Sequence, residues 1–533
     1  MAAILVCALA VPLVLAGCAP SNMDVNSYVV KQSGKEVGSQ KVTIEDITNG
    51  VSYSSTESMP FTEFGTTFTR KLTVAKDLKS TLSYQSTEKV PGAAYTSDLQ
   101  NATVGDGFGF FANDLQTFEW VPQLTVDKKM IAYEPLSVCT AQALLDRFLS
   151  ANVPNATALV VIPSRSPVPR EILVDRPSKF VMRITSQGID EVDVTFDKNS
   201  FVTGLHTGSF TIAKASPGSF TAMAYQPVTK GTTFSEVSVG TTQKLAGGGK
   251  LDLAGSFYLP VKATKPYRAV ILTGDEGPQD RTGGGFLSQV ADALAGQGMV
   301  VLTCDRRGVP KSGGSYATDT RSTLLSDIDS QVDYLVGRGD IDTNKIALVG
   351  YGEGGLLSAT AATTNPYVKR LVLMATPSVT LFPDLMRTQV DEAASSGALL
   401  PSESGYQQHL IDQMIAAVNS TPARNLSVGG HNVFLDWMRS WMAATPPADL
   451  AALKVPVLVM QGTADDVVPA AQAAQIMQTL AARAGGQQQL AQFDGLGHSF
   501  GKELSQAASK PNRMHPQVDP KVLDALTTWL KAN

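Results

Sequence analysis

The segment that decides the fold of the C-terminal half is Lys345-Ile-Ala-Leu-Val-Gly350-Tyr-Gly352-Glu-Gly354-Gly355-Leu-Leu-Ser-Ala. It predicts an apolar strand, a sharp glycine-rich turn and then a helix. A turn of this kind carries a nucleophilic serine when its frame is Gly-x-Ser-x-Gly. Here the frame is Gly350-x-Gly352-x-Gly354, so the scaffold is present and the hydroxyl is missing. Glycine has no side-chain atom that could attack a carbonyl.

Two later segments extend this pattern. An apolar run from Val455 predicts a buried strand, and it is followed by an acidic turn that contains Asp465 and Asp466. A glycine-rich loop after the last expected strand contains His498. Nucleophile turn, acid and histidine is a known chain order for a catalytic triad. We therefore assign Asp465 as the acid and His498 as the base, with Gly352 in the nucleophile position. Asp465 could otherwise cap the helix that follows it, and Asp466 is the less suitable acid because it lies one place late.

With these segments in view, residues 240–533 resemble the dienelactone hydrolase and serine aminopeptidase branch of the α/β-hydrolase fold. Members of that branch typically carry Gly-His-Ser-x-Gly-Gly where this chain has Gly350-Tyr-Gly-Glu-Gly-Gly355. The stretches Leu251–Pro260, Gly277–Arg281 and Asp305–Gly313 support the resemblance. It implies a doubly wound, mainly parallel sheet and an origin among ester or peptide hydrolases.

The oxyanion hole of such a site needs backbone N–H groups rather than particular side chains. The resemblance implies that one donor is the amide of Glu353 and that the other comes from the loop Gly274, Asp275 and Glu276. Members of that branch often have the sequence His-Gly-Ser-Gly-Pro in this loop, whereas this chain has Thr-Gly-Asp-Glu-Gly-Pro. Asp275 and Glu276 are expected to bring negative charge to the place where an oxyanion would form, which opposes acyl transfer.

The chain is expected to contain two folded domains. Residues 18–235 show short alternating apolar and polar runs, typical of antiparallel strands with one wet face, plus one helix near 140–150. We expect a β-rich domain built as a curved sheet or open barrel. Residues 236–533 alternate strand and helix patterns, which predicts the α/β-hydrolase domain. A mostly helical insertion at about 378–450 is expected to form a lid over the strand ends.

The N-terminus predicts a membrane anchor. Residues 1–17 form an apolar run that suits a secretory signal, and the small residues before Cys18 resemble a bacterial lipobox. Acylation of Cys18 would anchor the protein to a membrane lipid layer without a spanning helix. We therefore expect a lipoprotein of the bacterial cell envelope that faces the periplasm or the exterior. A nucleic-acid partner is not expected, because the net charge is −5 and no run of lysine or arginine is present.

Two other interpretations of the motifs, a dinucleotide site and a metal site, are disfavoured. The glycine turn also satisfies Gly-x-Gly-x-x-Gly, but the next apolar strand, 370–375, ends without the acidic residue that a dinucleotide site requires. The sequence contains neither His-Glu-x-x-His nor a paired-cysteine spacing, so no metal is expected. We expect no cofactor.

Three functional hypotheses remain. The first is an envelope-anchored relative of ester or peptide hydrolases in which nucleophilic serine catalysis is lost because of Gly352. The second is a working ester or peptide hydrolase that uses water activated by His498 and Asp465, or an unidentified nucleophile. The third is a ligand-binding or scaffold lipoprotein. A small ester or peptide is the expected ligand.

Overall fold

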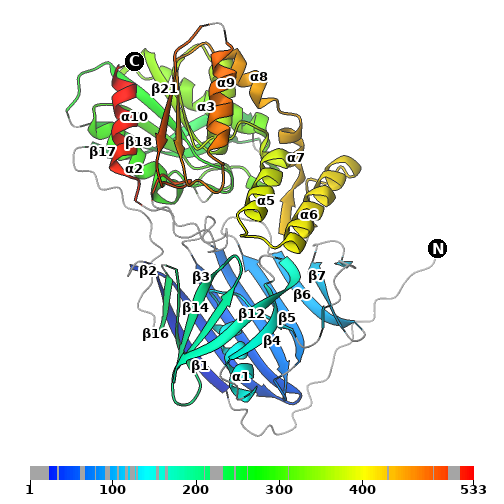
Figure 1. Cartoon of the computed structure of the whole chain (residues 1–533). Helices are drawn as coiled ribbons and strands as arrows, with labels where there is room; N and C mark the ends of the chain where they lie inside the picture. Colours follow the sequence, from blue (N-terminus) through cyan, green and yellow to red (C-terminus); the bar gives the residue numbers. More distant parts are fainter. Residues whose placement is uncertain are drawn as a thin grey trace.

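The structure is a computed structural model of the whole chain (Figure 1). It describes residues 23–532 apart from 33–34, 60–65, 79, 90–96, 105–106, 114–117, 121–125, 128–129, 152–154, 163–165, 209, 216–231, 245–247, 261, 310, 429–430, 484 and 502–516. The expected signal at residues 1–17 and the expected lipidation site Cys18 lie outside the described residues.

The N-terminal part is a large, almost entirely antiparallel sheet. In the described residues its strand order is β10-β11-β12-β13-β14-β15-β16-β1-β2-β3-β4-β5-β6-β7-β8, and β9 also pairs with β7. One pair, β10 with β11, is parallel. The bounds are β1 Met23–Gln32, β2 Lys35–Ile47, β3 Gly50–Met59, β4 Thr66–Ala75, β5 Thr81–Lys89, β6 Ser97–Val104, β7 Gly107–Asn113, β8 Phe118–Trp120, β9 Val126–Asp127, β10 Ile131–Ala132, β11 Asn155–Ile162, β12 Ser166–Ser178, β13 Val181–Ser186, β14 Ile189–Phe196, β15 Val202–Thr207 and β16 Phe210–Lys214.

The single α-helix described in this part, α1 (Val138–Ala151), packs against the buried face of the sheet. Strand residues alternate between this face and solvent, as in β14, where Val192, Val194 and Phe196 are buried and their neighbours are not. The side chains of Leu144 and Leu145 on α1 join the same core. The alternating sequence pattern thus produces one solvent-exposed face and one buried face, and α1 packs on the buried face of the curved sheet (Figure 1).

The C-terminal part has the α/β-hydrolase fold. Its eight-stranded sheet has the order β17-β18-β20-β19-β21-β22-β25-β26 in the described residues, with antiparallel β17 and β18 at one edge and parallel strands from β20 onwards. The bounds are β17 Thr232–Lys244, β18 Lys250–Pro260, β19 Tyr267–Thr273, β20 Val300–Cys304, β21 Ile341–Tyr351, β22 Val368–Met374, β25 Val457–Gly462 and β26 Gln488–Phe493. The sheet therefore begins at Thr232, slightly before the boundary expected at residue 236.

Helices cover both faces of this sheet. Helices α3 (Arg321–Val336), α4 (Glu353–Thr364) and α9 (Ala471–Ala481) share one apolar core with the strands. Helices α2 (Phe286–Gly296) and α10 (Pro520–Ala532) share the core on the other face. Alternate residues of one strand serve the two cores: in β21, Leu348 belongs to the first core and Val349 to the second. The fold class expected from the sequence, a doubly wound sheet preceded by a β-rich domain, is confirmed.

The segment between β22 and β25 contains helices and one hairpin. It comprises the short helix η3 (Leu381–Leu385), α5 (Met386–Ser395), α6 (Pro401–Ser420), β23 (Asn425–Val428), β24 (His431–Phe434), α7 (Leu435–Met442) and α8 (Pro446–Ala452). We call this segment the lid. Helices α5 and α6 lie between the two sheets (Figure 1). No helix among the described residues is both long enough and apolar enough to span a membrane.

A buried ion pair joins the N-terminal sheet to the lid. The guanidinium of Arg170 on β12 donates to both carboxylate oxygens of Glu403 on α6, at 3.0 and 2.7 Å, and each side chain is only 1% exposed. Close to it, a Cβ on Gly188 would lie 2.6 Å from the backbone oxygen of Ala398 in the lid. The two domains therefore pack tightly at this point.

Candidate active site

Strand β21 runs into α4 through a strained turn centred on Gly352. Gly352 has φ 56° and ψ −121°, which L-residues with a side chain adopt only at a cost. The surrounding glycines are required by close packing: a Cβ on Gly350 would lie 2.2 Å from the Gly354 oxygen, and one on Gly354 would lie 2.4 Å from the Gly274 oxygen. The glycine-rich sequence therefore forms a tight strand-to-helix turn whose central residue has no side chain.

The acid and the histidine meet as expected. Asp465 follows β25, and its Oδ1 accepts hydrogen bonds from the backbone N–H groups of Val467 and Val468, both at 2.9 Å. Its Oδ2 lies 2.9 Å from Nδ1 of His498. Both residues are buried, with 7% of Asp465 and 3% of His498 exposed. The backbone bonds fix the carboxylate, and the carboxylate fixes the orientation of the imidazole.

A second carboxylate contacts the other nitrogen of the ring. Oδ2 of Asp275 lies 2.9 Å from Nε2 of His498, and Oδ1 of Asp275 accepts the backbone N–H of Glu353 at 2.8 Å. A Cβ built on Gly352 would lie only 1.8 Å from Oδ1 of Asp275. The carboxylate of Asp275 therefore occupies the space that a side chain at position 352 would need, and it binds the amide that we expected to serve the oxyanion.

The remaining residues of the expected oxyanion loop adjoin this carboxylate. The backbone N–H of Glu276 also hydrogen-bonds Asp275. The backbone oxygen of Gly274 contacts the start of α4 closely enough to exclude a side chain at Gly354. The amides of Glu353 and Glu276, which could serve an oxyanion, are thus bound to a carboxylate from the same loop.

The charge state of the site follows from its two carboxylates. Burial alone would lower the pKa of His498, but the charges and hydrogen bonds of Asp465 and Asp275 outweigh it and raise that pKa to about 10. Burial alone would raise the pKa of Asp275, but the hydrogen bond and charge of His498 and the amides of Glu353 and Glu276 hold it below its usual value. Each ring nitrogen faces a carboxylate oxygen, so both nitrogens donate. The site is a carboxylate–imidazolium–carboxylate array at neutral pH.

The side chain of Glu353 ties the turn to the lid. It is fully buried and accepts hydrogen bonds from Nη1 of Arg306 at 2.6 Å and from the indole N–H groups of Trp437 at 2.7 Å and Trp441 at 2.9 Å. Both tryptophans lie on α7. The sequence assigns a role only to the backbone amide of Glu353. Its side chain connects the lid, the loop after β20 and the nucleophile turn.

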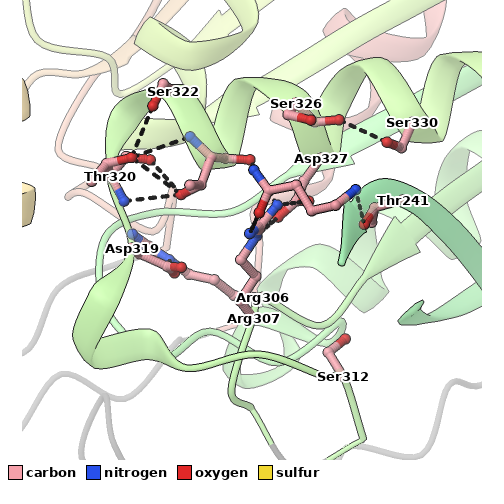
Figure 2. Close-up of polar contacts among 12 residues, drawn as sticks. Thr241, Arg306, Arg307, Ser312, Asp319, Thr320, Ser322, Ser326, Asp327 and Ser330 are labelled. Atoms are coloured by element: carbon pink, nitrogen blue, oxygen red, sulfur yellow. Dashed lines mark hydrogen bonds and ion pairs between the residues drawn. The ribbon is translucent and has the colours of Figure 1, made fainter. Parts of the chain in front are cut away.

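Ion pairs connect the loop after β20 to α3 and to the segment just before it (Figure 2). Arg306 donates to Asp319 at 3.2 Å, and the neighbouring Arg307 pairs with Asp327. Burial raises the pKa of Asp319 to about 7 against the opposing effect of Arg306. These contacts hold the Arg306 guanidinium against Glu353.

A small cavity adjoins the array. Its volume is about 60 Å³, and its lining includes Asp275, Leu272, Leu287, Arg306 and Leu357. Among the described residues, no group of three or more histidine, cysteine, aspartate or glutamate side chains could hold a metal ion.

One family model matches part of the chain. Residues 283–505 match the model of the family Hydrolase_4, described as serine aminopeptidase, S33. The C-terminal part is thus related to the α/β-hydrolase family of hydrolases. No curated protein matches the chain by sequence.

Solved structures that match the chain include several esterases and hydrolases. Est1E from Butyrivibrio proteoclasticus, solved with ferulic acid bound, is 17% identical over 56% of this chain and 96% of its own, with a TM-score of 0.38. The esterase Pf2001 from Pyrococcus furiosus is 14% identical over 49% of this chain and 83% of its own, with a TM-score of 0.35. The α/β hydrolase GrgF from Penicillium sp. sh18 is 15% identical over 56% of this chain and 98% of its own, with a TM-score of 0.38.

The sequence located Gly352, Asp465, His498 and the oxyanion loop, but it did not reveal that Asp275 binds the histidine. A signal was available. An acid in the oxyanion loop and a glycine at the nucleophile position are two departures that compensate each other sterically, since a side chain at 352 and the carboxylate of Asp275 cannot coexist.

Proposed function

We propose that this protein is an envelope-anchored relative of ester and peptide hydrolases that has lost serine-dependent acyl transfer. Toward esters and peptides, its C-terminal site acts as a binding site or scaffold and not as a catalyst of acyl transfer. The observation that carries the proposal is the carboxylate of Asp275, which lies where a serine hydroxyl would lie.

Three requirements of acyl transfer are unmet in this geometry. Gly352 supplies no nucleophile. The amide of Glu353, which would stabilise a developing oxyanion, already binds Asp275. His498 carries a proton on each nitrogen and so cannot accept one from a serine or a water. A negative carboxylate at the oxyanion position also repels a tetrahedral intermediate.

Hydrolysis of esters by directly activated water is disfavoured for the same reason. Water activation needs a neutral imidazole with a free Nε2, and here Nε2 faces Oδ2 of Asp275 at 2.9 Å. Asp465 and Asp275 raise the pKa of His498 to about 10, so the protonated ring predominates at pH 7.

A serine-directed fluorophosphonate probe tests this proposal. The full-length protein is expected to take no label within residues 240–533 and to hydrolyse p-nitrophenyl acetate at the buffer rate. The matched variant is Gly352→Ser combined with Asp275→Gly, which restores the hydroxyl and removes the obstructing carboxylate; it is expected to take the label. Labelling of the unmodified protein in that range would overturn the proposal.

Envelope anchoring through Cys18 is a separate part of the proposal. It rests on the small residues that precede Cys18 and on the apolar run at residues 1–17. Expression in a bacterium with labelled fatty acid is expected to yield a labelled, membrane-associated protein, while Cys18→Ser is expected to yield an unlabelled one. Equal labelling of both proteins would refute acylation at this residue.

A further inference from the structure

The N-terminal domain contains a cavity of about 400 Å³ where its sheet meets α1. Three neighbouring strands line it, because Asp24 of β1 pairs with Ile44 of β2, and Ile44 pairs with Tyr53 of β3. Helix α1 contributes Gln142 and Asp146, which lie one helical turn apart on the same face. The turn between β14 and β15 also contributes lining residues. We call this space the N-terminal cavity.

The size of the N-terminal cavity is that of a small-molecule site. Pockets that bind small ligands in proteins typically measure about 300–1,000 Å³, and this cavity falls within that range. One water takes roughly 30 Å³ of liquid volume, so the cavity has room for a molecule of about a dozen non-hydrogen atoms.

Three carboxylates give the N-terminal cavity its charge. The side chains of Asp24 and Asp46 are exposed, and Asp146 is half-buried. Within the part of the chain that the structure describes, none of the three forms an ion pair, and no lysine or arginine lines the cavity. A concave surface with one sign of charge concentrates ligands of the opposite sign. The lining therefore favours a cation.

The inner carboxylate is held in place by neutral donors. Oδ2 of Asp146 accepts the hydroxyl of Tyr53 at 2.7 Å, and its Oδ1 accepts Nε2 of Gln142 at 2.8 Å. Gln142 is itself fixed, because its Oε1 accepts the backbone N–H of Val202 at 2.7 Å. Burial raises the pKa of Asp146, while these two hydrogen bonds act in the opposite direction. The carboxylate is thus oriented but has no cation to compensate its charge.

The rest of the lining is apolar. Side chains of Ile44, Val51, Leu78 and Phe201 share the cavity with the carboxylates. A hydrated metal ion would gain nothing from these side chains, whereas an amine with an apolar body would remove apolar surface from water. We propose that the N-terminal cavity binds a compact organic ammonium ion, with its ammonium group toward the aspartates and its apolar body against these side chains. The proposal goes beyond the proposed function, which concerns the C-terminal site.

Calorimetric titration of the full-length protein tests the proposal with two probes of equal size. Tryptamine carries an ammonium group, and tryptophol has a hydroxyl group in its place. Tryptamine is expected to bind, and tryptophol is expected to bind about tenfold more weakly or less, because it lacks the attraction to the three carboxylates. Absence of tryptamine binding, or equal dissociation constants for the two probes, would overturn the proposal.

Two variants locate the bound amine. Asp146→Asn keeps the size of the side chain and is expected to raise the dissociation constant of tryptamine about tenfold. Asp46→Asn, at an exposed position that folding does not depend on, is expected to raise it about threefold. The matched control is Glu45→Gln, which removes the same charge from the next residue of β2 but does not line the cavity; its dissociation constant is expected to stay unchanged.

The proposal is wrong if both aspartate variants bind tryptamine as tightly as Glu45→Gln does. None of these results bears on serine-dependent acyl transfer, which the fluorophosphonate probe reports separately.

Discussion

Gly352→Ser by itself is expected to destabilise the C-terminal domain without creating an esterase. A Cβ at this position would lie 1.8 Å from Oδ1 and 2.2 Å from Cγ of Asp275. Neither distance is tolerable, so Asp275 must leave. It would give up its hydrogen bonds to the Glu353 amide and to His498.

The magnitude can be worked from these contacts. A side chain at φ 56° costs about 1–3 kcal/mol in backbone strain. Each hydrogen bond to a charged group contributes roughly 1.5–3 kcal/mol. The lower ends of these ranges, counted once for strain and twice for hydrogen bonds, add up to a loss of about 4 kcal/mol in the free energy of unfolding of the single variant. Gly352→Ser combined with Asp275→Gly removes the collision, so the two substitutions are expected to be coupled rather than additive.

Denaturant unfolding followed by tryptophan fluorescence measures the loss, since Trp437, Trp441 and Trp529 all lie in the C-terminal domain. Asp275→Gly alone completes the double-mutant cycle. Fluorophosphonate labelling is expected for the double variant and not for Gly352→Ser. If Gly352→Ser is as stable as the unmodified protein and takes the label as readily as the double variant, then Asp275 does not occupy the serine position and the reasoning is wrong.

Three further predictions concern charge. The pKa of His498 is raised to about 10 in the folded protein, so its stabilisation is fully present below the unfolded value of about 6.5 and is lost as the pH rises through about 10. NMR of the ring is expected to show imidazolium at pH 8, and a titration near the unfolded value would contradict the array. Glu353→Ala leaves the buried guanidinium of Arg306 without this acceptor and is expected to lower the free energy of unfolding by about 3–5 kcal/mol. The control Glu392→Ala, at an exposed site on α5, is expected to change it by no more than about 0.5 kcal/mol. Equal losses in the two variants would disprove the role of Glu353 in holding the turn to the lid. Arg170→Met is expected to destabilise by about 3–5 kcal/mol in calorimetry, and adding Glu403→Leu is expected to recover part of this because no uncompensated buried charge remains; a larger loss in the double variant would count against the buried pair.

The fold of the C-terminal domain could be predicted from the sequence because the patterns that indicate it are local. The apolar strand and glycine turn around Gly352 and the regular alternation of strands and helices predict the doubly wound sheet without knowledge of any long-range contact. In the N-terminal part, the alternation of apolar and polar residues predicted strands and one wet face. It could not predict the order in which the strands pair, because every such strand offers the same backbone donors and acceptors.

The sequence by itself was enough to predict which residues stand at the nucleophile, acid and base positions, since chain order and turn chemistry point to Gly352, Asp465 and His498. Only the tertiary structure decided which side chain faces Nε2 of His498 next to the turn at Gly352. Asp275 lies against Gly352 because β19 and β21 are adjacent parallel strands that end at the same edge of the sheet, and the loop after β26 brings His498 to the same place. The charge of the histidine depends on that meeting, because a pKa reflects all neighbouring charges in space and not the neighbours along the chain.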